Sequence, residues 1–308
     1  MTKSKVIVFG YDELLLASLE FISQTQTEIV AVVFPSNRKD WRANTVRQIV
    51  TDKGFLILEQ PPSADIAEFA EKIRQINPDL IYVWSYPMIL PEEIIKIPRY
   101  GSINLHIGLL PEYRGTNGVR WALLNGEEQT GVTIHFMDSG IDTGSVISRI
   151  LFPITADDNI LSLMQKSKTA GLHLLKHCWQ QIASGRANAV NQDESKANYY
   201  SAKMFIPETI DWSKSNIEIH NLIRASVAPF PGVYTFWNGL KVFIKKSIPL
   251  QNFKLKSTFG TIEKIDVNGV EITTGNGSLL ITEMEVDEKV IPNASLYDFG
   301  LRLGGQLQ

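Results

Sequence analysis

The chain has 308 residues, a length that predicts two domains, because a single hydrophobic core seldom extends much beyond about 250 residues. Its composition, 44% hydrophobic and 20% charged with a net charge of −3, is typical of a globular protein and gives no sign of a nucleic-acid-binding chain. One cysteine, no apolar run of about 18 residues and no signal peptide argue against a disulfide framework, a cysteine-rich zinc site and a membrane span, so we expect a cytoplasmic protein.

The first part of the chain alternates apolar, strand-like runs with helix-like stretches. We predict strands over 5–10, 29–34, 80–84 and 102–106, and helices over 14–23, 43–52 and 64–76. This alternation predicts an α/β fold with a Rossmann-like, doubly wound and mostly parallel sheet. Ligands of such sheets bind beyond the carboxyl ends of the strands, where His106 stands.

The turn after the first strand argues against a nucleotide cofactor. It reads Gly10-Tyr11-Asp12-Glu13 and lacks the G-x-G-x-x-G pattern that binds a dinucleotide pyrophosphate. The phosphate-binding motif G-x-x-x-x-G-K-[ST] does not occur in the chain either. We therefore expect neither a dinucleotide cofactor nor nucleotide hydrolysis.

The middle of the chain reads as one long helix over 157–183, with Asp157 or Asp158 as its N-cap and Met164 on its apolar stripe. His173 and His177 have metal-ligand spacing there, but their face is polar and we interpret them as a surface pair. Cys178 is interpreted as a small buried hydrophobe.

A polar linker is predicted over 187–208, between a first domain at 1–186 and a second at 209–308. After a short helix over 216–226 come short alternating runs separated by Asn-Gly turns, which predict a small β-barrel. These runs are 233–237, 240–246, 260–267, 269–274 and 278–286.

The residues with the clearest chemistry are Asn104, His106 and Asp142. On a strand, Asn104 and His106 project to the same face, about 7 Å apart. Asp142 follows 36 positions after His106, and it reaches them only if a later loop returns to the end of that strand. An amide donor, an imidazole and a carboxylate together make an acyl-transfer site.

The segments around these residues resemble the signature of the N10-formyltetrahydrofolate-dependent formyltransferases. That signature reads N-x-H-x-S-L-L-P-x-x-R-G, then G-x-T-x-H-x-x-x-x-x-x-D-x-G. The matching positions are Asn104, His106, Leu109, Leu110, Pro111, Arg114, Gly115, Gly131, Thr133, His135, Asp142 and Gly144. Two departures are Gly108, where the family has Ser, and the stretch 116–118, where it has a small residue and Pro.

The resemblance also implies a fold and a set of roles. Residues 210–244 resemble the start of the C-terminal domain of the tRNA and amino-sugar branches, which implies an OB-like β-barrel. The catalytic residues would be Asn104, His106 and Asp142, with His135 in a supporting place. N10-formyltetrahydrofolate would be the co-substrate, with no metal, held by Tyr86, Met88, Ile89, Leu90, Asp138, Ser139, Gly140 and Ile141. The acceptor would approach Arg114, Gly115, Thr116 and Asn117, where Arg114 either shapes the loop or contacts substrate.

The amine acceptor is predicted from weaker signals. The segment over 35–45 is short, and residues 201–308 carry 11 Lys and Arg against 11 Asp and Glu, so the basic surface that tRNA binding requires is not expected. A nucleotide-linked amino sugar is the first choice, methionyl-tRNA the alternative, and a smaller amine such as glycinamide ribonucleotide the third. A catalytically silent binding module and a hydrolase that deformylates the folate stay open, as does a homo-oligomer.

Overall fold

A computed structural model describes residues 3–62, 65–201, 204, 206, 208–251, 257–292, 295 and 300–308. The described helices are α1 (Glu13–Ser23), α2 (Trp41–Asp52), α3 (Ile66–Ile76), α4 (Glu92–Ile95), α5 (Gly118–Leu124), α6 (Ile160–Ala183) and α7 (Asn216–Ala225), with a 3-10 helix η2 (Glu194–Lys196). The described strands are β1 (Ser4–Phe9), β2 (Thr27–Pro35), β3 (Ile57–Gln60), β4 (Leu80–Trp84), β5 (Ser102–His106), β6 (Arg114–Gly115), β7 (Gln129–Phe136), β8 (Val146–Pro153), β9 (Tyr199–Tyr200), β10 (Val233–Trp237), β11 (Leu240–Leu250), β12 (Ile262–Asp266), β13 (Gly269–Thr273), β14 (Ser278–Val286) and β15 (Lys289–Pro292).

The chain divides into two compact units that interleave along the sequence. The first contains Met1–Gly118, Thr130–Phe152 and Gln165–Ser201, and the second contains the remainder, including Ala202–Gln308. A division into domains at a linker over 187–208 stays a prediction. No helix in the described part of the chain is long and apolar enough to cross a membrane.

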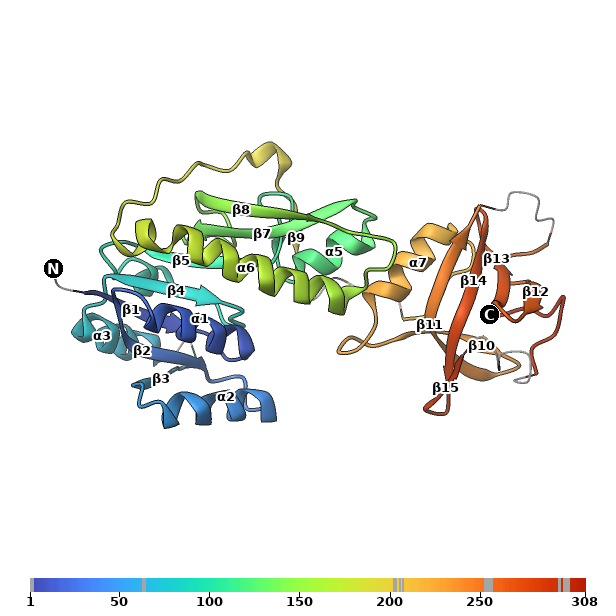
Figure 1. The fold of residues 1–308 in the computed structure, drawn as a ribbon, viewed down its shortest axis with the longest axis horizontal. Helices are drawn as coiled ribbons and strands as arrows, with labels where there is room; N and C mark the ends of the chain where they lie inside the picture. The colour runs from blue at the N-terminus through green and yellow to red at the C-terminus, as the bar shows by residue number, and fades with distance from the viewer. Residues whose placement is uncertain are drawn as a thin grey trace. The chain divides into compact units, whose positions relative to one another are not determined.

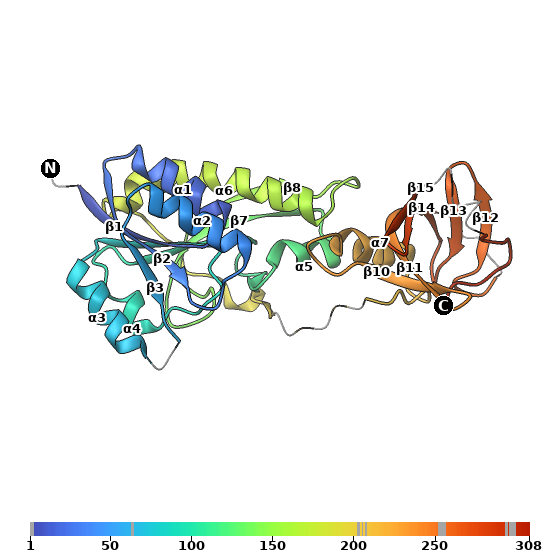
Figure 2. The same ribbon diagram turned by 90° about the horizontal axis from the view of Figure 1, so that it is seen from below.

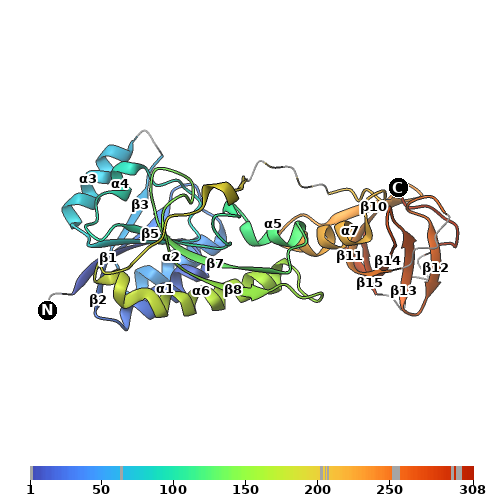
Figure 3. The same ribbon diagram turned by 90° about the horizontal axis from the view of Figure 1, so that it is seen from above.

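The first unit is built on a seven-stranded sheet in the order β3-β2-β1-β4-β5-β7-β8 (Figure 1). The pairs β2–β3, β1–β2, β1–β4 and β4–β5 are parallel, whereas β7 runs antiparallel to β5. Figure 3 shows β7 and β8 side by side at that end of the sheet. This topology confirms the predicted Rossmann-like, mostly parallel α/β sheet.

Helices cover both faces of this sheet (Figure 2). Val8 packs in a cluster with residues of α1, α2 and α6, while its neighbour Ile7 packs with residues of α3 and α4 on the other face. Both side chains are fully buried, because successive residues of a central strand point into opposite helix layers. That double burial explains why the central strands read as unbroken apolar runs.

The start of α6 differs from the prediction. The helix begins at Ile160, and its N-cap side chain is Asn159, whose Oδ1 accepts the N–H groups of Leu161 and Ser162. Asp158 is not the N-cap, because its carboxylate accepts the N–H and the hydroxyl of Thr155 and the hydroxyl of Ser162.

The predicted apolar stripe of α6 is also partly wrong. Met164 is 44% exposed, since it lies one residue round the helix from the buried Leu163. Cys178 is buried, and His173 and His177 are exposed, as predicted for a small core residue and a surface pair.

The second unit contains an antiparallel sheet in the order β10-β11-β14-β13-β12, with β15 paired to β14. This separate antiparallel sheet agrees with the predicted small C-terminal β-domain. Trp237 is buried in its core and Phe236 is 38% exposed, because adjacent strand residues face opposite sides. Lys245 and Lys246 of β11 pair with Glu285 and Glu283 of β14.

Candidate active site

The structure brings Asn104, His106 and Asp142 together at the carboxyl end of β5. Asn104 and His106 lie two residues apart on this strand, and the antiparallel register of β7 sets His135 opposite Asn104. Asp142 follows in the loop between β7 and β8 and returns to the end of β5. The loop return that the sequence required is therefore present.

The Asp142 carboxylate faces four nitrogen atoms. Its Oδ2 accepts the backbone N–H of Gly115 at 2.8 Å and lies 3.4 Å from His106 Nδ1. Its Oδ1 lies 3.4 Å from both Asn104 Nδ2 and His135 Nε2. The backbone of Asp142 is left-handed, with φ of 55°, a conformation that non-glycine residues seldom adopt.

Carbonyl groups fix which nitrogen of each histidine carries a proton. His106 Nε2 donates to the Tyr113 carbonyl at 2.7 Å, so its Nδ1 is the atom that faces Asp142. His135 Nδ1 donates to the Phe136 carbonyl at 2.7 Å, which leaves Nε2 to accept from Asn104 Nδ2 at 3.2 Å. His135 thereby orients the amide of Asn104, a contact that only the β5–β7 register reveals.

The pKa values of the two central groups both lie below their ordinary values. Burial lowers the pKa of His106, and the opposing effect of Asp142 is smaller. Burial alone would raise the pKa of Asp142, but attraction to the His106 and His135 rings and the hydrogen bond from the Gly115 N–H outweigh it, so the carboxylate stays ionised.

The residues predicted to hold the folate have different surroundings. The Tyr86 hydroxyl is buried without a hydrogen-bond partner among the described residues, and the Tyr86 ring lies edge-on to Phe9 at 5.3 Å. Ile89 is 78% exposed, whereas Leu90 is 4% exposed and packs in the core. The side chain of Leu90 therefore has a packing role. Met88 Sδ accepts a long contact from the Ser36 hydroxyl at 3.8 Å.

The second predicted folate segment, 138–141, leads directly into Asp142. The Asp138 carboxylate accepts the backbone N–H of Gly140 at 3.0 Å and the hydroxyl of Thr143, which folds the loop on itself. Ser139 and Gly140 are exposed, and Ile141 is 53% exposed. These three residues present an open edge beside the site.

The predicted acceptor residues are mostly engaged with other parts of the chain. Arg114 is fully buried, and its guanidinium binds Gln192, Glu194 and Tyr199. This arrangement favours loop shape over substrate contact as its role. Thr116 N–H donates to the Tyr200 carbonyl at 2.8 Å.

Asn117 is exposed, with a left-handed φ of 60°.

Gly108, where the chain departs from the family signature, leaves no room for a side chain, because a Cβ there would lie 2.7 Å from His106 Nε2.

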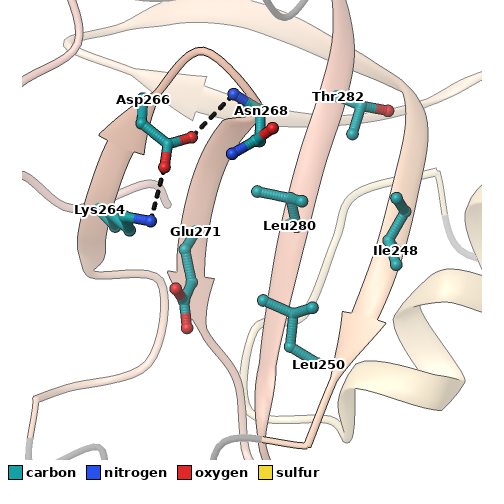
Figure 4. A pocket seen from close by; sticks show the side chains of 9 residues that line it. Ile248, Leu250, Lys264, Asp266, Asn268, Glu271, Leu280 and Thr282 are labelled. Atoms are coloured by element: carbon teal, nitrogen blue, oxygen red, sulfur yellow. Dashed lines mark hydrogen bonds and ion pairs between the residues drawn. The ribbon is translucent and has the colours of Figure 1, made fainter.

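A cleft of about 400 Å³ lies on the sheet of the second unit and contains none of the predicted site residues (Figure 4). Its lining includes Ile248, Leu280 and Glu271, and its charged rim is already paired. Asp266 binds Lys264 at 2.5 Å and accepts the N–H of Asn268 at 2.8 Å. Its size alone does not make this cleft the reaction site.

Two parts of the sequence, which together cover most of the chain, match the same protein family. A family described as "Formyl transferase" matches residues 3–178, and its "Formyl transferase, C-terminal domain" matches residues 207–299. The chain belongs to the formyl transferase family. It is an N-formyltransferase. In the part of the chain that the structure describes, no three His, Cys, Asp or Glu side chains form a cluster that could hold a metal ion.

Two groups of known proteins resemble this formyltransferase. It is 34% identical to the methionyl-tRNA formyltransferase of Clostridioides difficile over 92% of this chain and 93% of the relative, and 33% identical to that of Citrifermentans bemidjiense over 100% and 97%. Among solved structures it resembles an N-formyltransferase from Helicobacter canadensis in complex with folinic acid and dTDP-3-aminofucose, at 25% identity, a TM-score of 0.70, and coverage of 90% and 98%. It also shares the fold of WlaRD, a sugar 3N-formyl transferase, at 24% identity, a TM-score of 0.71, and coverage of 94% and 99%.

Proposed function

We propose that this formyltransferase moves the formyl group of N10-formyltetrahydrofolate onto the primary amine of a nucleotide-linked amino sugar. The observation that carries the choice of acceptor is the similarity, along almost the whole chain, to the Helicobacter canadensis enzyme in complex with folinic acid and dTDP-3-aminofucose. The net charge of −3 and the equal numbers of cations and anions in residues 201–308, 11 of each, support it, since tRNA phosphates favour a basic surface.

The residues beside the site fit a folate. A pterin needs apolar cover for its ring faces and hydrogen-bonding groups at its edge. The exposed side chains of Ile89 and Ile141 can supply the cover, and the buried, unpartnered hydroxyl of Tyr86 can supply a hydrogen bond. The donor brings the formyl carbon; the groups that act on it belong to the protein.

We assign stabilisation of the formyl oxygen to Asn104. One hydrogen of its Nδ2 is donated to His135 at 3.2 Å, and the other reaches Asp142 only at 3.4 Å. Because that second contact is long, the same N–H can also be donated, without rotation of the amide, to an oxygen that gains negative charge beside it. One well-placed donor of this kind contributes about 3–4 kcal/mol of transition-state stabilisation.

We assign the proton to His106 and Asp142. In the overall reaction the amine nitrogen bonds to the formyl carbon, the bond from that carbon to N10 breaks, and one proton passes from the amine to N10. Because His106 Nε2 is occupied by the Tyr113 carbonyl, a proton taken up by the ring goes to Nδ1, facing Asp142 at 3.4 Å. The ionised carboxylate stabilises the ring in that charged state.

Substitution of these side chains tests the assignment. We expect Asn104→Ala, His106→Gln and Asp142→Asn each to lower kcat by at least about 100-fold, because each removes a group that acts only in the transition state. Formation of tetrahydrofolate from formyl-folate in the presence of the amine measures this. His173→Ala, on an exposed face of α6, is the control and should keep the native rate. A native rate for His106→Gln or Asp142→Asn contradicts the assignment.

Methionyl-tRNA is the second candidate acceptor. It is favoured by the 34% identity to the Clostridioides difficile methionyl-tRNA formyltransferase over 92% of this chain. The two candidates differ in their response to salt. Binding of tRNA weakens steeply as salt rises, because cations are released from its phosphates, whereas turnover of a sugar nucleotide should change little.

A further inference from the structure

A downstream segment of the first unit lies against the active-site loops. The strand β9, Tyr199–Tyr200, pairs in parallel with β6, Arg114–Gly115. A Cβ at Gly115 would clash with the Tyr200 carbonyl oxygen, so the two backbones are as close as a glycine permits. Gly115 is also the residue whose N–H binds the Asp142 carboxylate.

Gln192, just upstream in this segment, connects that pairing to the loop of Asp142. Its Nε2 donates to the backbone carbonyls of Asp142 and Gly144, both at 2.7 Å. Its Oε1 accepts from Nε and a terminal nitrogen of Arg114 at 3.1 and 3.0 Å. We call these four hydrogen bonds the Gln192 bridge.

The amide of Gln192 fits in one orientation only. Turning it over would set Oε1 against two carbonyl oxygens and Nε2 against the guanidinium of Arg114, which has no acceptor. The amide therefore acts as a donor toward Asp142 and as an acceptor toward Arg114.

Arg114 gives the bridge a fixed end. It is fully buried, and beyond Gln192 it forms a bidentate pair with Glu194, at 2.9 and 2.5 Å, and a hydrogen bond with Tyr199. A bidentate guanidinium–carboxylate pair allows little change of geometry. Arg114 thus holds Gln192 while the amide of Gln192 holds the loop.

The backbone conformation of the Asp142 loop requires contacts that hold it in place. Asp142 has a left-handed backbone with φ of 55°, which a non-glycine residue keeps only where its surroundings impose it. The two carbonyls that Gln192 binds are those of Asp142 itself and of Gly144, on either side of Thr143. They define the direction in which the Asp142 side chain leaves the loop.

We propose that Gln192 is a positioning residue for formyl transfer: the Gln192 bridge holds the Asp142 loop in its left-handed conformation and so keeps the carboxylate turned toward His106 and Asn104. The inference rests on the proposed role of Asp142 in the reaction. Gln192 lies 50 residues downstream of Asp142, in a polar segment with no catalytic motif.

Two substitutions separate the two ends of the bridge. Gln192→Met keeps the shape of the side chain and removes all four hydrogen bonds. Gln192→Glu keeps two acceptors for Arg114 but has no donor for the carbonyls of Asp142 and Gly144. We expect both to lower kcat by about 10- to 100-fold with little change in KM, because a displacement near 1 Å of a catalytic group has an effect of that size.

The matched control is Ser195→Ala, in the same segment, where the hydroxyl binds only Asp193 among the described side chains. It should keep the native kcat. Rates are measured well below the melting temperature of each variant, so that loss of folded protein does not contribute. A native kcat in Gln192→Glu means that the contact with Arg114 suffices, and it overturns the proposal, as does a native kcat in Gln192→Met.

A second measurement is independent of the reaction. Long-range 1H–15N spectra of the histidine rings follow the titration of His106, one of five histidines in the chain. The nearby Asp142 carboxylate raises the pKa of His106 against the effect of burial, so a displaced carboxylate should move the titration of His106 to lower pH. We expect this in Gln192→Met and not in Ser195→Ala.

The two readouts distinguish failure of the bridge from failure of the proposed function. If Asp142→Asn is inactive but Gln192→Met has native kcat and a native His106 titration, the Gln192 bridge is wrong and the function stands. If Asp142→Asn is fully active, the proposed function of the site is wrong. The titration of His106 in Gln192→Met still decides whether Gln192 positions the carboxylate: movement supports the bridge and no movement overturns it.

Discussion

The protonation of His106 and Asp142 reflects a competition between burial and contact. His106 lies between two acceptors, the Tyr113 carbonyl and the Asp142 carboxylate, and both favour a doubly protonated ring. Burial has the opposite and larger effect, so the pKa of His106 lies below its ordinary value. The resting ring is therefore neutral at pH 7, with Nδ1 able to accept a proton beside an anion.

This competition predicts a pH dependence of stability. A histidine whose pKa is lower in the folded than in the unfolded chain binds fewer protons when folded, so stability falls as pH drops below the unfolded value of 6.5. Between pH 7.5 and 5.5 we expect the wild type to lose about 1 kcal/mol more unfolding free energy than His106→Gln. Urea unfolding at both pH values measures this. Equal losses in the two proteins would contradict the direction given for His106.

At the scale of elements, the site depends on how closely α6 packs beneath it. Gly171 of α6 lies over β4 and β5, and a Cβ there would be 2.7 Å from the ring of Trp84 and 3.2 Å from Leu105. Both neighbours are buried core residues. Because Leu105 stands between Asn104 and His106, the spacing of this helix bears directly on the strand that carries them.

We therefore expect Gly171→Ala to destabilise the protein by about 1–3 kcal/mol. Alanine favours a helix by about 1 kcal/mol over glycine, but the overlap with Trp84 forces the packed layers apart. The control is His173→Ala, at an exposed position of the same helix, which should have little effect. Denaturant unfolding checks both, and an unchanged or raised stability of Gly171→Ala would show that the layers yield without cost.

For the whole molecule, the sequence predicted those parts in which local pattern and tertiary environment agree. The strands 80–84, 102–106, 233–237 and 278–286 begin and end where predicted, since apolar runs and Asn-Gly turns bound them. The strand β8 was not predicted, because it lies at the end of the sheet order with much of its surface exposed and lacks a buried strand's apolar run.

The site was predictable only in part for the same reason. Asn104, His106 and Asp142 stand in a compact signature, and the structure brings them together. The contact of His135 with Asn104 depends on the antiparallel register of β5 and β7, and that of Gln192 with Asp142 on a chain return over 50 residues. Each of these contacts joins residues that are far apart along the chain, so neither appears as a local pattern in the sequence.

The most direct test of the account is an acceptor assay. The protein is incubated with N10-formyltetrahydrofolate and either a dTDP- or UDP-linked amino sugar or methionyl-tRNA, and tetrahydrofolate, formate and the formylated product are measured. We expect tetrahydrofolate and an N-formylated sugar nucleotide in equal amounts, no formate, and no product with Asp142→Asn. Formylation of methionyl-tRNA alone, or release of formate without any formylated amine, would contradict the account.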